Sequence, residues 1–269
     1  MFKYIGIRGH RGAGKNTISY LLAVALDYYT RNNSWDGFEK VYNDAVERVL
    51  LDEDFLSESD FKNVFFESFA DTAKVLLNQI TGIPTDWMYD DWHKEAVIFD
   101  LKDFSIEVAQ NKLNLKSIKE TQRLYTADEL VEKVMAGDVF KKEEHIYLTL
   151  RELIAYYSKY VMQTFFGNDV WIKSLENNKW ENERFYASNK KIYKIFVDCK
   201  FPTEISYIYN NKGCIVKINR DNNVKSGTNI SAELENDTRF DYEINLDGNL
   251  LNPDTIETIK SITSKIIAE

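Results

Sequence analysis

The stretch FKYIGIRGHRGAGKNTISYLLAVALDYY, residues 2–29, decides the fold. Residues 2–8 alternate in polarity and are rich in β-branched and aromatic side chains, which predicts a strand. Glycines at positions 9, 12 and 14 then predict a tight loop, and from Asn16 onward the apolar residues recur at helical spacing. The sequence therefore predicts a strand, a glycine loop and a helix in direct succession.

The segment GHRGAGKNT, residues 9–17, has the composition of a phosphate-binding loop, or P-loop. Glycines let successive N–H groups turn onto phosphate oxygens, a lysine reaches the β and γ phosphates, and a hydroxyl binds Mg²⁺. The consensus places Ser or Thr at position 16, where this chain has Asn16, with Thr17 one step later. The alternative is a glycine-rich turn whose Lys15 is merely solvated. The predicted ATP-binding residues are Arg11, Gly12, Ala13, Gly14, Lys15, Asn16 and Thr17.

The rest of the chain alternates apolar strands with amphipathic helices. We expect strands at 64–70, 192–198, 214–218 and 241–246, and helices at 71–80, 150–166, 203–211 and from 252 onward. Near-continuous apolar strands separated by helices predict a parallel sheet covered on both faces, an α/β fold of three layers.

We expect a single domain over residues 1–269, in which the core carries helical insertions. The predicted core comprises residues 1–33, 63–85 and 149–269, the predicted insertions are 34–62 and 86–148, and the polar stretch 221–239 is a candidate closing loop. The insertion at 86–148 should hold mixed small elements. Arg220 and Arg239 flank the closing loop, which would exclude water from a transfer reaction.

Composition narrows the classes of function. The 269 residues include 34 Lys and Arg against 43 Asp and Glu, a net charge of −9, which gives no support for a protein that coats a nucleic acid duplex. Two cysteines are too few for a disulfide framework or a zinc site, and the three histidines lack metal-ligand spacing. Because no segment has the pattern of a signal peptide or a membrane span, we expect a cytoplasmic protein that acts on small molecules.

A second phosphate-site signal lies at IFVD, residues 195–198. In P-loop proteins an apolar strand often ends in an acid that holds Mg²⁺ or its water. Taken alone, an apolar run that ends in aspartate is common. Together with the glycine loop, it makes Thr17 and Asp198 the candidate metal contacts.

Five blocks, in matching order, resemble the phage deoxynucleoside-monophosphate kinases, a P-loop kinase family related to adenylate kinase. They are GHRGAGKNT at 9–17, similar to GxxxxGKDT; SFADTAK at 68–74, similar to FADPLK; the helix at 150–175, similar to RELLQxLGTD…W; IFVDCKFPTE at 195–204, similar to DxRFPNE; and DYEINLDG at 241–248, similar to the final strand of the family. Together they cover less than a quarter of the chain, and order and spacing carry the resemblance.

The chain also departs from the family pattern. Lys200 stands where the family usually has arginine, and a lysine cannot offer phosphate the same bidentate fork. Residues 158–160, Ser-Lys-Tyr, replace Gly-Thr-Asp, and Asn16 replaces an aspartate. These changes bear on substrate or metal preference, and none removes Lys15.

The resemblance implies a role for each matching residue. Lys15 would contact the β and γ phosphates, Arg151 would clamp the 5′-phosphate of the acceptor, and Trp171 would stack on its base. The other implied contacts are Arg11 and Lys200, which would add charge at the transferring phosphoryl group, Asp198 near the metal, and Asp71 and Lys74 at the acceptor phosphate or sugar. The plainer alternatives are a solvated helix arginine, a core tryptophan and a surface pair at 71 and 74.

The implied reaction transfers the γ-phosphoryl of Mg·ATP to a deoxynucleoside 5′-monophosphate, giving ADP and the diphosphate. Two other functions remain open. One is another P-loop kinase, such as one that phosphorylates dephospho-coenzyme A, and the other is a nucleotide-binding protein that has lost transfer. Dimers are common in the family, so the resemblance allows a homodimer. A composition rich in Asn, Lys, Tyr and Ile suits the AT-rich genome of a phage and the cytoplasm of its host.

Overall fold

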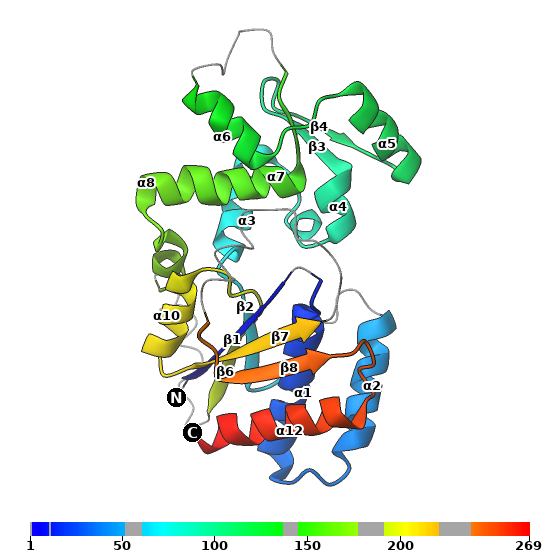
Figure 1. Cartoon of the computed structure of the whole chain (residues 1–269), viewed down its shortest axis with the longest axis vertical. Coiled ribbons are helices and arrows are strands. Elements are labelled where there is room, and N and C mark those ends of the chain that lie inside the picture. The colour runs from blue at the N-terminus through cyan, green and yellow to red at the C-terminus, as the bar shows by residue number, and fades with distance from the viewer. Residues whose placement is uncertain (1, 11, 52–60, 137–144, 177–190, 221–237) are drawn as a thin grey trace. The chain divides into compact units, whose positions relative to one another are not determined.

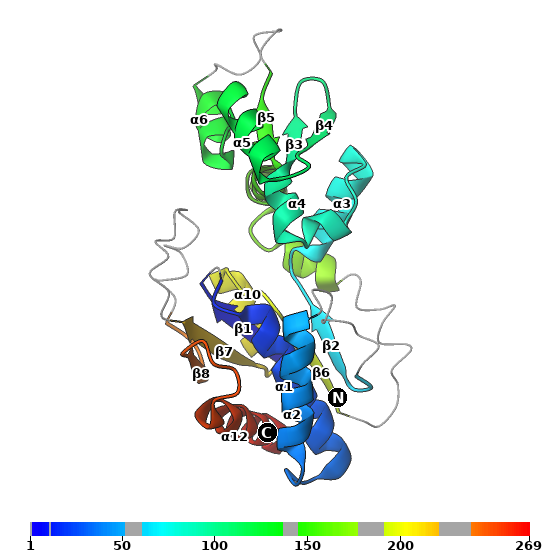
Figure 2. The same cartoon turned by 90° about the vertical axis from the view of Figure 1, so that its right-hand side faces the viewer.

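The computed structural model describes residues 2–10, 12–51, 61–136, 145–176, 191–220 and 238–269. Contacts within the chain define two compact units. Unit 1 comprises Met1–Phe69 and Lys179–Glu269, and unit 2 comprises Ala70–Asn178. The two units are defined only by the contacts within the chain and do not test the predicted single domain with insertions. That domain organisation stays a prediction. Figures 1 and 2 show the elements of each unit.

Unit 1 is built on a five-stranded sheet in the order β2-β6-β1-β7-β8. Its strands are β1 (Phe2–Gly9), β2 (Val64–Glu67), β6 (Ile192–Phe196), β7 (Cys214–Arg220) and β8 (Tyr242–Leu246). Every neighbouring pair is parallel, which confirms the predicted parallel sheet. Three expected strands are shorter in the structure: β2 ends at Glu67 and not at residue 70, β6 ends at Phe196 and not at residue 198, and β8 begins at Tyr242.

Helices cover both faces of this sheet. Helices α1 (Lys15–Asn32), α2 (Phe38–Leu51) and α12 (Pro253–Ala268) share one buried apolar cluster with the strands, and α10 (Pro202–Asn210) packs against β1 and β7. Figure 2 shows α1 and α10 on opposite sides of the strands. Helices α10 and α12 each begin with proline, whose fixed φ suits the first helical turn. The α/β architecture with helices on both sheet faces is therefore confirmed.

Unit 2 contains a three-stranded antiparallel sheet in the order β4-β3-β5. The strands are β3 (Val97–Asp100), β4 (Ser105–Val108) and β5 (Tyr147–Thr149). The helices before and between these strands are α3 (Asp71–Thr81), η2 (Asp86–Met88), α4 (Asp91–Ala96), α5 (Lys112–Thr121) and α6 (Ala127–Met135). The expectation of mixed small elements over 86–148 holds for its described residues.

The long helix expected at 150–166 is interrupted in its middle. It consists of α7 (Leu150–Ala155), a π-helical stretch η3 (Tyr156–Gln163) and α8 (Thr164–Phe166). Further helical residues follow at 170–176. The π-helical stretch includes residues 158–160, where the chain departs from the family pattern. A helical segment over 150–166 is therefore confirmed, but its middle is π-helical and not α-helical.

Two further sequence expectations concern cysteines and the closing loop. Cys199 and Cys214 are both buried, and neither forms a disulfide. Most of the closing loop, 221–237, lies outside the described residues, whereas Arg239 donates to Pro202 O at 3.2 Å and to Ser206 Oγ at 3.0 Å. Among the described residues, no helix is both long and apolar enough to cross a membrane.

Candidate functional site

The glycine loop, residues 9–14, connects the carboxyl end of β1 to the first turn of α1. Gly12 and Gly14 have φ values of 77° and 88°, a backbone conformation that glycine adopts without strain. Gly9 lies so close to β7 that a Cβ there would meet Ile218 O at 2.8 Å. Backbone geometry therefore explains these three glycines before any ligand is considered.

The loop follows β1, the middle strand of the order β2-β6-β1-β7-β8. The chain leaves β1 for strands on one side of it and later adds β7 and β8 on the other, so β1 lies at the switch point of the sheet. In open parallel sheets ligands bind beyond the carboxyl ends of the strands at this point. The sequence-predicted ATP site therefore lies where this class of sheet binds ligands.

Main-chain oxygens of the loop hold the ammonium group of Lys15. Lys15 Nζ donates to Gly9 O at 3.0 Å and to His10 O at 3.1 Å. It also lies 3.6 Å from Asp198 Oδ1. The lysine is thus folded over the glycine loop, with its charge next to a carboxylate that follows strand β6.

Asp198 lies two residues past the end of β6 and bridges two lysines. Besides Lys15, it contacts Lys200, whose Nζ lies 2.5 Å from Asp198 Oδ2. The structure therefore brings together Lys15, Asp198 and Lys200, three of the residues expected to act in transfer. Two cations thus flank one carboxylate at this place, an arrangement that can accept an anionic ligand.

The amino end of α1 adds backbone donors to the same loop. The N-cap residue is Gly14, which has no side chain to accept a hydrogen bond from the first N–H groups of the helix. The first turn of α1 also contains no acidic residue. The first N–H groups of a helix have no partner inside the helix, and the helix dipole favours an anion there. Asn16 is exposed and Thr17 partly exposed, as ligand contacts require.

Two arginines, Arg11 and Arg220, belong to the glycine loop or its surroundings. Arg11 lies outside the described residues. Arg220 Nη1, at the end of β7, lies 3.5 Å from Gly12 O, so a third cation reaches the loop from the neighbouring strand. From the sequence, Arg220 was expected only beside the closing loop, because its approach to Gly12 depends on the pairing of β1 with β7.

Glu204 is a buried carboxylate that sequence analysis missed. It accepts hydrogen bonds from the backbone N–H groups of Lys200, at 2.6 Å, and Phe201, at 2.9 Å. Burial raises the pKa of the Glu204 carboxyl to about 7, against the lowering effect of these two N–H donors. Glu204 therefore fixes the turn that carries Lys200. Its place in the first turn of α10, in the block FPTE, is the signal that could have found it.

In unit 2, two carboxylates hold Arg151 at the start of α7. Arg151 Nε donates to Glu95 Oε1 at 2.6 Å, and Nη2 donates to Asp91 Oδ1 at 3.1 Å. Lys94 Nζ also lies 3.2 Å from Asp91 Oδ1. Burial by itself raises the pKa of Asp91, but the charges of Lys94 and Arg151 outweigh it and the pKa is lowered. Arg151 is thus an ion-paired arginine, unlike the solvated one considered from the sequence.

Asp71 and Lys74, on α3, form the expected pair one helical turn apart, with Lys74 Nζ 3.5 Å from Asp71 Oδ1. Tyr89 joins both residues. Its hydroxyl donates to Asp71 Oδ1 at 2.7 Å, and Lys74 Nζ lies 3.5 Å from the centre of its ring. Lys94 Nζ in turn donates to Tyr89 O at 2.8 Å. These contacts join the predicted acceptor residues of α3 to the surroundings of Arg151 within unit 2.

Trp171 is 5% exposed. Such burial is what the core alternative requires, and stacking on an acceptor base would need the ring to become accessible. The base-stacking role stays a prediction.

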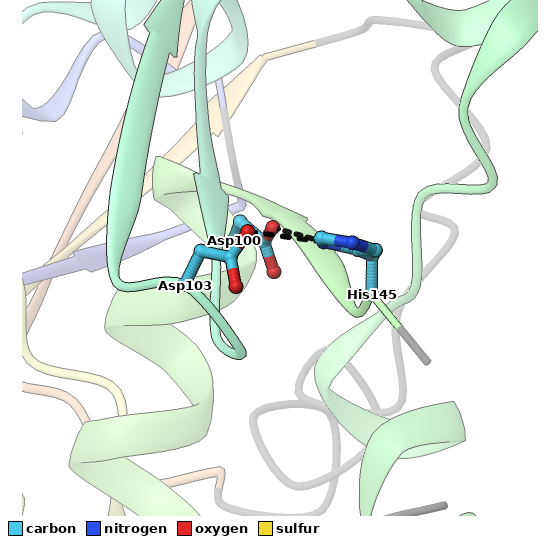
Figure 3. Close-up of side chains that lie close together, drawn as sticks. All are labelled: Asp100, Asp103 and His145. Atoms are coloured by element: carbon cyan, nitrogen blue, oxygen red, sulfur yellow. Dashed lines mark hydrogen bonds and ion pairs between the residues drawn. The ribbon is translucent and has the colours of Figure 1, made fainter. Parts of the chain in front are cut away.

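A histidine and two aspartates meet at one end of the small sheet of unit 2 (Figure 3). His145 Nδ1 lies 2.6 Å from Asp100 Oδ2 and 3.7 Å from Asp103 Oδ2. Lys102 Nζ lies 3.4 Å from His145 Nε2, which places a positive charge beside the ring. Asp100 ends β3 and His145 precedes β5, so this contact joins the ends of paired strands and accounts for the cluster without a metal.

Comparisons with known proteins add no family. A scan against models of protein families found no match, and a search of curated proteins found none with significant similarity. The resemblance to phage deoxynucleoside-monophosphate kinases therefore rests on the residues quoted above.

Proposed function

We propose that this protein is a P-loop kinase that transfers the γ-phosphoryl of Mg·ATP to a deoxynucleoside 5′-monophosphate. One observation carries the proposal: a glycine loop at the switch point of a parallel sheet holds Lys15 beside Asp198. A lysine, helix N–H groups and neighbouring cations at that place favour a polyphosphate ligand. The blocks resembling the deoxynucleoside-monophosphate kinases favour a nucleotide as the acceptor.

Phosphoryl transfer asks the protein for positioning and for neutralisation of charge. Lys15 would exchange one of its carbonyl acceptors for a phosphate oxygen, a charge-assisted hydrogen bond stronger than the one it replaces. The N–H groups at the start of α1 would bind the remaining phosphate oxygens. Lys200, held by Asp198 and by the backbone contact to Glu204, would add positive charge near the transferring group.

Thr17 and Asp198 carry the type of donor atoms that bind a magnesium ion. A hydroxyl and a carboxylate are the hard oxygen donors that Mg²⁺ takes, and the ion keeps several of its waters. Because Asp198 already pairs with Lys15 and Lys200, a contact through water suits it best. The ion would neutralise charge on the β and γ phosphates.

The acceptor would bind unit 2. Arg151 offers the bidentate geometry that suits a phosphate, and Lys94 and Lys74 lie in the same network of contacts. In this proposal Asp71 and Tyr89 hold Lys74 in place.

The test is release of ADP from Mg·ATP with dAMP, dGMP, dCMP, dTMP and their ribose counterparts as acceptors. We expect one or more deoxynucleotides to support turnover and Lys15→Ala to reduce kcat at least about 10³-fold. Lys40→Ala, which removes an exposed lysine from α2, is the matched control and should leave the rate unchanged.

The negative outcomes are informative. Turnover of dephospho-coenzyme A alone would replace the nucleotide acceptor. Tight binding of ATP without ADP release on any acceptor would contradict the kinase proposal and favour a nucleotide-binding protein.

A further inference from the structure

The two carboxylates that contact Arg151 differ in the guanidinium nitrogen that they contact and in their exposure to solvent. Glu95 contacts Nε, and its side chain is 34% exposed. Asp91 contacts Nη2, and its side chain is 80% exposed. An exposed ion pair is worth little, so Asp91 can be exchanged for another anion at small cost, whereas Glu95 is the better anchor.

A single oxygen atom lies between two cations. Asp91 Oδ1 is 3.1 Å from Arg151 Nη2 and 3.2 Å from Lys94 Nζ. Lys94 is positioned by its other hydrogen bond, to Tyr89 O at 2.8 Å. An anionic oxygen shared by a guanidinium and an ammonium is the arrangement that a phosphate oxygen would adopt between the same groups.

We infer that Asp91 occupies the place of the acceptor phosphate between Lys94 and Arg151, and that Glu95 orients Arg151 to receive that phosphate. The inference deepens the proposed function and rests on it. The acceptor phosphate displaces the Asp91 carboxylate toward solvent and binds both cations. Glu95 keeps its contact with Nε, so the guanidinium keeps its orientation while Nη2 exchanges Asp91 for the ligand. Asp91 is thus an internal competitor, and Glu95 is a positioning residue.

The inference makes two similar substitutions act in opposite directions. Asp91→Asn removes the competing charge and should lower KM for the acceptor about threefold. Glu95→Gln removes the anchor of the guanidinium and should raise KM for the acceptor about tenfold and lower kcat. Lys94→Met should raise the same KM at least about tenfold. KM for ATP should stay unchanged in all three variants.

The experiment measures steady-state kinetics on the full chain with each of the four deoxynucleoside monophosphates. Glu120→Gln, an exposed carboxylate of α5 in the same unit, is the control for a simple change in net charge. If Asp91 and Glu95 only stabilised the fold, Asp91→Asn and Glu95→Gln would change KM for the acceptor in the same direction. That result, or no effect of either substitution, would overturn the inference.

Calorimetric binding of the same monophosphates without ATP separates this inference from the proposed function. If the wild type shows no turnover but Asp91→Asn tightens and Lys94→Met weakens monophosphate binding, the kinase proposal fails and the phosphate site stands. If turnover is present and neither substitution alters binding, the kinase proposal stands and the inference fails.

Discussion

The two units hold their principal cations in different ways. In unit 1, Lys15 donates to the carbonyl oxygens of Gly9 and His10, main-chain atoms that the turn between β1 and α1 fixes. In unit 2, the carboxylates of Asp91 and Glu95 hold Arg151. Main-chain acceptors keep their place when a ligand arrives, whereas an exposed carboxylate can leave. The comparison indicates a lysine held by fixed main-chain atoms in unit 1 and an arginine held by one exchangeable carboxylate in unit 2.

The same contrast extends to the charged groups behind each region. Unit 1 buries Lys194 against Glu67, with 6% and 19% of their side chains exposed and 2.5 Å between Nζ and Oε1. It also buries Glu204 below Lys200. Buried charges resist rearrangement, because moving one partner leaves the other without compensation. Charge in unit 1 therefore contributes to a rigid frame, and three predictions test this difference.

The largest expected effect concerns the buried pair of Lys194 and Glu67. Glu67→Leu alone leaves the Lys194 ammonium in an apolar environment and should lower the free energy of unfolding by about 3 kcal/mol. The double variant Glu67→Leu/Lys194→Met removes both charges and should recover most of that loss. Urea unfolding of the wild type, both single variants and the double variant gives the coupling energy.

The control for this cycle lies on the same sheet. Lys217 and Glu243 form an exposed pair between β7 and β8, with 3.1 Å between the charged atoms. Its coupling energy should stay below about 1 kcal/mol. Equal coupling in the two pairs would contradict the idea that burial fixes charge in unit 1.

The second prediction concerns the dependence of stability on pH. Burial raises the pKa of Glu204 from 4.5 to about 7. Between these values the folded chain binds the proton more tightly than the unfolded chain, so stability falls as pH rises. The loss is on the order of 3 kcal/mol and is complete above about pH 7. Glu204→Gln should therefore gain stability relative to the wild type between pH 5 and pH 7 and stay level above that.

Urea unfolding at several pH values measures this difference. Glu257→Gln, which removes an exposed carboxylate of α12, should give a curve parallel to that of the wild type. If Glu204→Gln also gave a curve parallel to that of the wild type, the Glu204 carboxyl of the wild type would have the same pKa in the folded and the unfolded chain.

The candidate site of unit 1 could be predicted from the sequence better than that of unit 2. The strand, glycine loop and helix over residues 2–29 were predicted because near neighbours in the chain determine them. Asp198 was predicted because it closes the apolar run at 195–198, although the strand itself ends two residues earlier, at Phe196. Strands β1 and β6 are parallel neighbours, so the segments that follow them leave the sheet at the same edge. Lys15 and Asp198 therefore lie beside one another.

The surroundings of Arg151 were not predicted, because its partners are distant in sequence. Glu95 and Asp91 lie 56 and 60 residues before Arg151 and belong to a short helix in a stretch without clear periodicity. The contact between Asp100 and His145 spans 45 residues in the same way. Glu204 was missed for another reason, since an acid in the first turn of a helix usually faces solvent.

The smallest expected effect tests a structural contact of unit 2. Asp100 accepts from His145 Nδ1 and from the N–H of Lys102, at 2.9 Å. Burial raises the pKa of Asp100, but these hydrogen bonds outweigh it and the pKa is lowered. A lowered carboxyl pKa contributes stability above the unfolded value of 3.8 that is lost as pH falls through the folded value.

Asp100→Asn should therefore destabilise the protein by about 1 to 2 kcal/mol at pH 7. The difference from the wild type should shrink as the pH falls below 3.8, because the folded wild-type carboxyl then takes up its proton as well. Urea unfolding at pH 7 and at a series of pH values below 3.8 measures this change. Asp103→Asn, an exposed neighbour 3.7 Å from the same His145 nitrogen, should have little effect at either pH. Equal losses at pH 7 would mean that the exposed carboxylate shares the contact, and unit 2 would then depend on surface charge for its fold as well as for its proposed ligand.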